Sequence, residues 1–240
     1  MESWSLLGFG ARGWGPALLA GAGMTLLVSA AGLLVGAVIG SLVAYAKIRR
    51  RPWQAALATG YTTVFRGVPE LLVVYFVYFG SSALLTDLAH LFGAAGFYGV
   101  PSFAAGALAV GAISGAYQAE VYRGAFGAVA KGEIEAARAV GMSPALAFRR
   151  VIAPQVLRFA IPGLGNLWQV ALKDSSLISV TGLVELMRIS EAGTGSTRQP
   201  FPFYLAAGGL YLALAAVSDR AFASAEARAT RGLRRVSGAA

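Results

Sequence analysis

The run ALLAGAGMTLLVSAAGLLVGAVIGSLVAYA, residues 17–46, contains no charged side chain and is followed directly by Lys47. A helix needs about 20 mainly apolar residues to cross a bilayer, and this run is longer than that. Residues 71–86 and 101–119 are also free of Lys, Arg and Glu. The 240-residue chain is 57% hydrophobic and only 13% charged, with a mean hydropathy of +0.64. These values exclude an ordinary soluble domain and predict an integral, all-α membrane protein.

Basic residues fall into three clusters that follow apolar segments. They are Lys47, Arg49, Arg50 and Arg51; Arg123, Lys131, Arg138, Arg149 and Arg150; and Arg228, Arg231, Arg234 and Arg235. Residues 80–101 contain no Lys or Arg at all. Positively charged loops stay on the cytoplasmic side, so this alternation predicts topology, with phospholipid head groups as the remaining partner for the charge.

The apolar segments and the charge clusters together predict five transmembrane helices. Their expected ranges are about 16–47, 54–80, 101–122, 154–173 and 201–222. The N-terminus is then outside and the C-terminus inside. No linker or internal repeat divides residues 1–240, so we expect one transmembrane domain with its core at about 16–225. The run 175–184 is too short to cross a membrane and is interpreted as a re-entrant or partial helix.

Small residues mark two of these expected helices. Gly32, Gly36 and Gly40 recur at four-residue spacing in the first, and Gly111 and Gly115 do so in the third. Such spacing places them on one face, where a neighbouring backbone can approach closely.

The charged loop at 124–150 has the pattern of a helix, a bend and a second helix. Lys131 to Val140 contains good helix formers, and Gly141 supplies a C-terminal stop. Ser143 and Pro144 are typical of an N-cap and a first helical position. Ala136 and Ala137 would leave a slim surface that fits a groove in a partner protein. An interfacial helix lying on lipid head groups is the alternative reading of the same residues.

The loop resembles the cytoplasmic signature of permease subunits of binding-protein-dependent ABC importers. The matching residues are Glu135-Ala136-Ala137, then Gly141, then Val151-Ile152-Ala153-Pro154, with Val151 and Ala153 in place of the usual Ile and Leu. Further stretches, YTTVFRGVPE at 61–70, GAYQAEVYRG at 115–124, PGLGN at 162–166 and LKDSSL at 172–177, are similar to the polar amino acid branch. Within that branch the chain is most similar to permeases for histidine, basic amino acids, octopine and nopaline.

The resemblance implies a type I importer permease in the bacterial inner membrane. It implies a second homologous permease, two ATP-binding subunits and a periplasmic solute-binding protein as partners. Glu135, Ala136, Ala137, Gly141 and Pro154 would then couple the permease to the ATPase, and a small amino acid or opine would be the substrate. The rival hypothesis is a self-contained carrier or channel driven by an ion gradient.

No catalytic, metal-binding or cofactor-binding pattern accompanies these motifs. The phosphate-binding motif G-x-x-x-x-G-K-[ST] is absent, because Gly127 and Gly132 are followed by Glu133. His90 is the single histidine and is expected to be an exposed residue of the outer loop. We therefore expect neither enzymatic activity nor a cofactor in this chain.

Polar residues within the expected membrane helices are candidates for a substrate path. Arg66 and Glu70 are four apart around Pro69, which is expected to break this span, as is usual at transporter sites. Glu70 could hold a cationic group of the substrate, or Arg66 and Glu70 could form a structural pair. Asn166, Gln169 and Lys173 lie on one helical stripe, followed by Asp174 and Ser175. This stripe could line the path or serve hydrogen bonding between helices. Glu120 and Arg123 are expected to pair at the cytoplasmic mouth.

Overall fold

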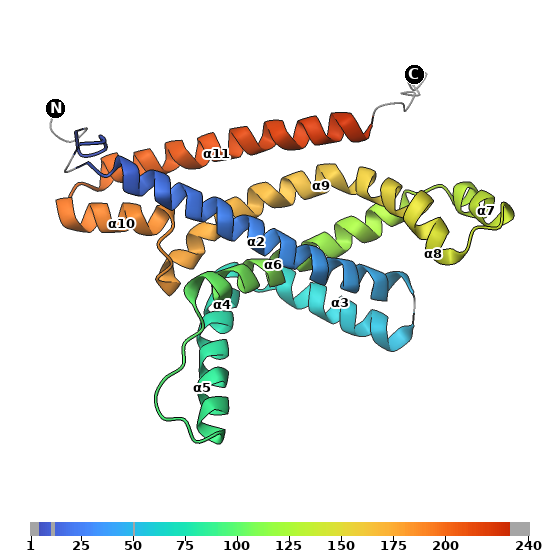
Figure 1. Cartoon of the computed structure of the whole chain (residues 1–240), viewed down its shortest axis with the longest axis horizontal. Coiled ribbons are helices and arrows are strands. Elements are labelled where there is room, and N and C mark those ends of the chain that lie inside the picture. Colours follow the sequence, from blue (N-terminus) through green and yellow to red (C-terminus); the bar gives the residue numbers. More distant parts are fainter. Residues whose placement is uncertain (1–4, 11–12, 50, 231–240) are drawn as a thin grey trace.

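The computed structural model describes residues 5–10, 13–49 and 51–230, and all regular structure in these ranges is helical. The prediction of an all-α chain is confirmed. The basic residues Arg50, Arg231, Arg234 and Arg235 lie outside the described ranges. The elements, labelled as in Figure 1, are α2 (Gly15–Ile48), α3 (Pro52–Gly67), α4 (Glu70–Tyr75), η1 (Phe76–Gly80), α5 (Ser81–Leu91), α6 (Ser102–Gly127), α7 (Lys131–Ala139), α8 (Pro144–Ala147), η2 (Phe148–Ile152), α9 (Ala153–Asp174), η3 (Ser175–Thr181), α10 (Leu186–Thr197) and α11 (Pro200–Ala229).

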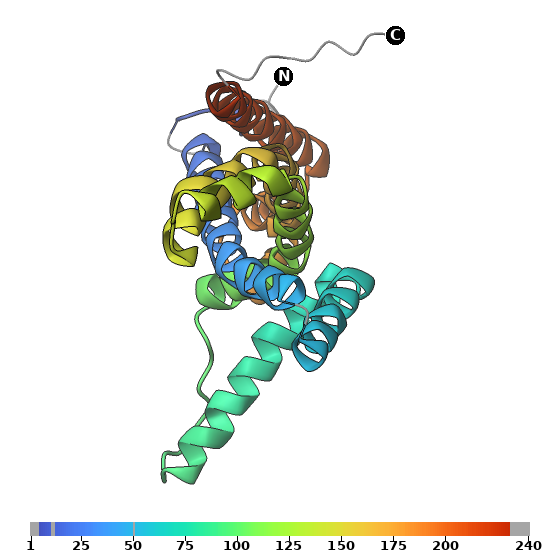
Figure 2. The ribbon, with the colours of Figure 1, turned by 90° about the vertical axis from the view of Figure 1, so that its right-hand side faces the viewer.

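Four long helices share the long axis of the molecule, and one arm leaves it. In Figure 1, α2, α6, α9 and α11 run along the long axis, whereas α5 projects away from them. Figure 2 shows the same arm extending from the bundle. α6 packs against α2, α3 and α9, and α2 also packs against α9, α10 and α11, so α2 and α6 lie at the centre of the bundle.

Glycines allow α2 and α6 to come into close contact. Gly32 lies against Val110, and Gly111 lies against Val35, so each helix inserts a valine where the other has no side chain. Gly36 likewise lies against Ser114, whose hydroxyl group occupies the space that a side chain at position 36 would need. The predicted close approach along these glycine faces is confirmed.

The expected crossing over 54–80 is broken at Pro69, as predicted. α3 ends at Gly67, Val68 is extended (φ −93°, ψ 139°), and α4 begins at Glu70. Pro69 has no amide hydrogen, and a residue before proline disfavours helical geometry, so the chain breaks at this point.

The predicted start of the outer loop at Gly80 is wrong. Helical structure continues through a π turn at Phe76–Gly80 and then through α5 to Leu91. Leucine and alanine favour the helix, and the first glycine after Gly80 is Gly93, with φ +80°. His90 is therefore in the last turn of α5, exposed as expected, where its Nε2 lies 2.8 Å from the carbonyl oxygen of Gly96.

The three basic segments gather at one end of the molecule. The connection between α2 and α3, the α7–α8 turn and the end of α11 all lie on the right of Figure 1, whereas α10 and the start of α2 lie on the left. Three helical segments within the described ranges are long and apolar enough to cross a membrane: Gly15–Ile48, Glu70–Leu91 and Pro200–Ala229.

Replacing Gly32 with alanine is expected to destabilise the contact between α2 and α6. The new Cβ would lie 2.7 Å from Cβ of Val110, so the helices must separate, at a cost of about 1–3 kcal/mol. A lower apparent melting temperature of the detergent-solubilised protein would report this. Gly23→Ala is the matched control, because its Cβ would meet nothing within 4 Å. Equal melting temperatures for the two variants would contradict the packing argument.

Candidate functional site

The α7–α8 turn begins with a fully hydrogen-bonded helix end. Gly141 adopts φ +76°, its amide donates to the carbonyl of Arg138 at 2.9 Å, and the Met142 amide donates to Ala137 at 3.1 Å. This is the Schellman arrangement, which needs a left-handed residue and so favours glycine. The predicted helix and its stop at Gly141 are confirmed, with α7 ending at Ala139.

The second helix of the turn starts as predicted and leads into the bundle. The Ser143 hydroxyl accepts the amide hydrogen of Leu146 at 3.4 Å, and Pro144 occupies the first position of α8. The chain continues through the π turn at Phe148–Ile152 into α9, where exposed Pro154 lies in the first turn. On the α8 side the turn is therefore connected to the bundle by helix alone.

Ala137 is placed differently from its neighbours in α7. Its side chain is only 4% exposed, and α7 packs against α8 and η2, whereas Glu135 and Ala136 are exposed. The expectation that Ala136 and Ala137 together form an outer surface therefore holds for Ala136 alone. Val140 adds an apolar side chain that is 72% exposed. The outer face of the turn is slim, partly apolar and negatively charged at Glu135.

The helix break separates Arg66 from Glu70. Arg66 lies in the last turn of α3, with its guanidinium 5.2 Å from the ring centre of Tyr117, and Glu70 opens α4. The ion pairs within the described ranges do not include Arg66 with Glu70. The structural pair considered from the sequence is therefore not formed.

Glu70 instead comes near Asp174. α4 packs against η3, which directly follows Asp174, and the charge of Glu70 acts on the Asp174 carboxyl group. Both residues are half-buried. Two acidic side chains that are about a hundred residues apart in sequence are thus placed near each other beside the helix break. Like charges near each other favour a cation between them.

The polar residues of the stripe predicted on α9 have different surroundings in the structure. The Gln169 side-chain amide donates to the carbonyl of Ala215 in α11 at 3.1 Å, and Asn166 and Gln169 line a cavity of about 260 Å³ between α9 and α11. Lys173 is exposed, and buried Ser175 donates to the carbonyl of Leu172 at 2.7 Å. Gln169 therefore has the interhelical role that was the alternative to lining the path.

A charge cluster joins α2, α3 and α6 near the basic end. Glu120 accepts a hydrogen bond from Arg123 at 2.8 Å, as predicted, and also forms an ion pair with Lys47. The Lys47 ammonium donates to the Thr62 hydroxyl at 2.6 Å. The role of Lys47 was missed because residues 73 positions apart give no local signal of contact.

Glu185 is a second residue that the sequence did not single out. Its carboxylate is fully buried and accepts the amide hydrogens of Met187 at 2.9 Å and Arg188 at 2.7 Å, which caps α10. Thr25 of α2 and Tyr211 of α11 donate their hydroxyl groups to the same carboxylate at 3.3 and 3.1 Å. One acidic group therefore joins three helices, and the four donors offset part of the cost of burying its charge.

The sequence of the chain matches a family model over most of its length. The model, described as binding-protein-dependent transport system inner membrane component, matches residues 36–231. The chain belongs to this family. It is therefore a membrane component of a transport system, which agrees with its long apolar helices.

Relatives of this permease include transport proteins of known substrate. It is 54% identical to the octopine transport system permease protein OccQ of Rhizobium meliloti, covering 96% of this chain and 97% of that protein. It is 50% identical to the nopaline permease NocQ of Agrobacterium fabrum, with 96% and 98% covered. It is 35% identical to the histidine/lysine/arginine/ornithine permease HisQ of Escherichia coli, with 93% and 97% covered.

Solved structures support the same fold. A crystal structure of an amino acid ABC transporter with histidines contains a chain with a TM-score of 0.74 and 31% identity, covering 90% of this permease and 95% of that chain. The MetNI methionine ABC transporter gives a TM-score of 0.63 at 19% identity, with 90% and 95% covered, and shows the fold alone.

Replacing Glu185 with alanine is expected to destabilise the permease by about 1–3 kcal/mol, because buried amide and hydroxyl donors lose their acceptor. Thermal unfolding in detergent measures the change. Glu191→Ala is the control in the same helix, since its ion pair with Arg188 spans 3.6 Å at the surface and contributes little. A Glu185→Ala variant as stable as Glu191→Ala would contradict the role assigned to the carboxylate.

Proposed function

We propose that this permease is the membrane subunit of an ABC importer that carries opines of the octopine and nopaline class, or basic amino acids, into the bacterial cytoplasm. The α7–α8 turn is the structural observation that carries the proposal. A capped helix with a slim exposed face, joined to the bundle by helix, is suited to docking against a partner that moves. The full-length similarity to octopine, nopaline and histidine/lysine/arginine/ornithine permeases supports the substrate class.

The proposed topology has five membrane crossings. These are α2, the broken pair α3 and α4, α6, α9 and α11, with the N-terminus periplasmic and the C-terminus cytoplasmic. The gathering of the three basic segments at one end supports this orientation, because positive loops stay in the cytoplasm. The chain then forms one transmembrane domain, with its core at about 16–225 and its cytoplasmic loop at 124–150.

The proposed assembly contains a second homologous permease, two ATP-binding subunits at the basic end and a periplasmic solute-binding protein at the other end. ATP hydrolysis belongs to the partner subunits. Glu135 and Ala136 present the docking surface of the coupling turn. Ala137, Gly141 and Pro154 shape that turn, through packing, a left-handed helix end and the start of α9 respectively.

Glu70 and Asp174 are the proposed contacts for the cationic group of the substrate. Lysine, arginine and ornithine are cations at neutral pH, and octopine and nopaline keep the guanidinium of arginine. A guanidinium between two carboxylates gains charge-assisted hydrogen bonds and relieves their mutual repulsion. The break at Val68–Pro69 exposes the first turn of α4, as is usual at transporter sites. Four further residues are proposed to border this path without holding the cation: Arg66, Asn166, Lys173 and Ser175. Gln169 is proposed to close the path on the side of α11.

Glu70→Gln and Asp174→Asn are each expected to raise the KM for uptake of a labelled cationic amino acid or opine roughly tenfold, through loss of a charge-assisted contact. Uptake by proteoliposomes containing the complete transporter measures the change. Asp87→Asn, on the exposed face of α5, is the matched control. Unchanged kinetics in both site variants would remove these residues from the path.

Ala136→Arg is expected to abolish co-purification of the ATP-binding subunits, because arginine keeps the helix but adds bulk to the docking face. Ala225→Arg adds the same side chain to an exposed site near the end of α11 and should leave co-purification intact. Retention of the ATP-binding subunits by Ala136→Arg, at full stability of the permease, would refute the docking role of the turn.

A further inference from the structure

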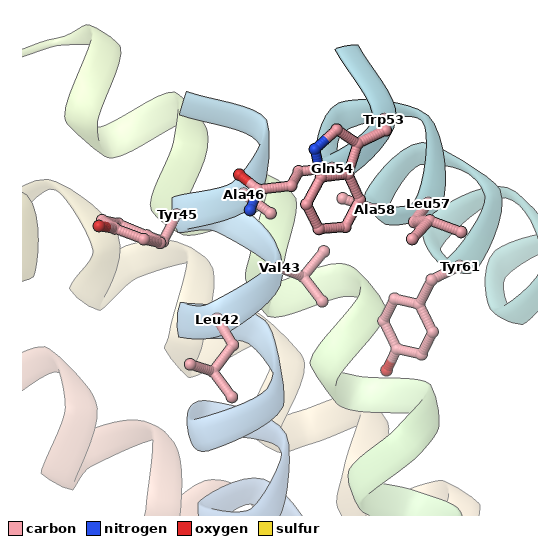
Figure 3. Close-up of a pocket in the computed structure, with 9 residues that line it drawn as sticks. All are labelled: Leu42, Val43, Tyr45, Ala46, Trp53, Gln54, Leu57, Ala58 and Tyr61. Atoms are coloured by element: carbon pink, nitrogen blue, oxygen red, sulfur yellow. The ribbon is translucent and has the colours of Figure 1, made fainter. Parts of the chain in front are cut away.

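An open apolar groove lies between the second half of α2 and the first half of α3. It has a volume of about 410 Å³ and is shown in Figure 3. Ala46 and Ala58 are too short to fill the space between the two helices, whereas Leu42, Leu57 and Trp53 flank it. These three side chains are 62–68% exposed, so the groove is open along its length.

The groove walls offer almost no polar groups. The Tyr61 hydroxyl is turned away to the carbonyl of Ala112, to which it donates at 2.5 Å, so Tyr61 presents its ring. The main exception is the side-chain amide of Gln54, which lies in the first turn of α3. Such a surface fits a hydrocarbon chain.

Two exposed arginines lie in the chain segment just beyond the groove. Arg49 extends over the ring of Tyr45, with 5.1 Å between its guanidinium carbon and the ring centre, and Arg51 is the exposed residue just before α3. Neither arginine forms one of the ion pairs within the described ranges. Lys47 is directed to the other side of α2, where Glu120 and Thr62 bind it.

The sequence on both sides of these arginines contains no acidic residue. Residues 3–69 contain no Asp or Glu, so the first turn of α3 carries no carboxylate to satisfy its amide hydrogens. A helix start of this kind favours a nearby anion, and the two arginines add to the effect. Arg49 is three residues after Ala46 and Arg51 is two residues before Trp53, so the two arginines directly follow and precede residues that line the groove.

We propose that this groove is a binding site for an anionic phospholipid of the inner leaflet. An acyl chain lies between Leu42 and Leu57, and the phosphate is bound by Arg49 and Arg51. From Leu42 to Arg49 the helix rises about 10 Å, which matches a head group at the interface with the first part of its chain in the groove. Trp53 lies at the level where indole rings favour the membrane interface. The inference rests on the proposed orientation, with the basic end in the cytoplasm.

Quenching of Trp53 fluorescence tests the site directly. The complete transporter is reconstituted with phosphatidylglycerol or phosphatidylcholine that carries brominated acyl chains, and the Trp53 signal is the difference between the native chain and Trp53→Phe. We expect brominated phosphatidylglycerol to quench Trp53 at a mole fraction at least about fivefold lower than brominated phosphatidylcholine does. Arg49→Gln/Arg51→Gln should remove this preference.

Arg220→Gln/Arg228→Gln is the control, because it removes two exposed charges from α11 near the same end. It should leave the preference unchanged. Equal quenching by both lipids would overturn the proposal, as would a preference that survives in Arg49→Gln/Arg51→Gln. Absence of quenching by either lipid would also overturn it, because another protein surface, such as the second permease, would then cover the groove. Substrate uptake by the same vesicles reports the proposed transport function separately.

Discussion

Close contact between the backbones of α2 and α6 is the constraint on which the rest of the structure depends. Side chains of each helix pack directly on glycines of the other helix. The two helix axes therefore lie closer together than larger residues would permit. Association of helices inside a membrane relies on such packing, because lipid is as apolar as the helix surfaces themselves. The remaining helices are arranged around this pair, with α9 against α6 and α10 against α2.

Polar contacts strengthen the bundle at both ends. Near the basic end, Lys47, Glu120 and Arg123 connect α2 with α6, and Thr62 includes α3. Toward the other end, Glu185 joins α10 to α2 and α11. Between these two clusters, side chains also donate to the backbone of neighbouring helices: Ser29 to the carbonyl of Ala171 and Gln118 to that of Leu33. Polar contacts therefore connect the helices along the bundle as well as at its ends.

Local signals predicted local structure well. Gly141, Ser143 and Pro144 act through their own backbone geometry, and the bend that they predict is present. The long helix α2 was predicted correctly, because the length and hydrophobicity of a segment are enough to identify a helix of this kind. The break at Pro69 was also predicted, because proline acts on its own backbone. The continuation of the helix to Leu91 was not foreseen, since helix propensity alone does not show where a hydrophobic stretch leaves the bundle. Three features depend on contacts between distant parts of the chain. They are the ion pair of Lys47, the capping role of Glu185 and the proximity of Glu70 to Asp174. Burial of Ala137 likewise depends on how α7 folds back on α8.

The π turn at Phe148–Ile152 gives the α7–α8 region a mechanical connection to the interior. α8, this turn and α9 follow one another without a loop, so helix extends from Pro144 to Asp174 over about 45 Å. A continuous helix passes a displacement from one end to the other, and Pro162 is the point where this helix bends most easily. A push applied at Pro144 would therefore reach Asp174 through the backbone of one helical segment, with bending at Pro162 setting how much of the movement arrives.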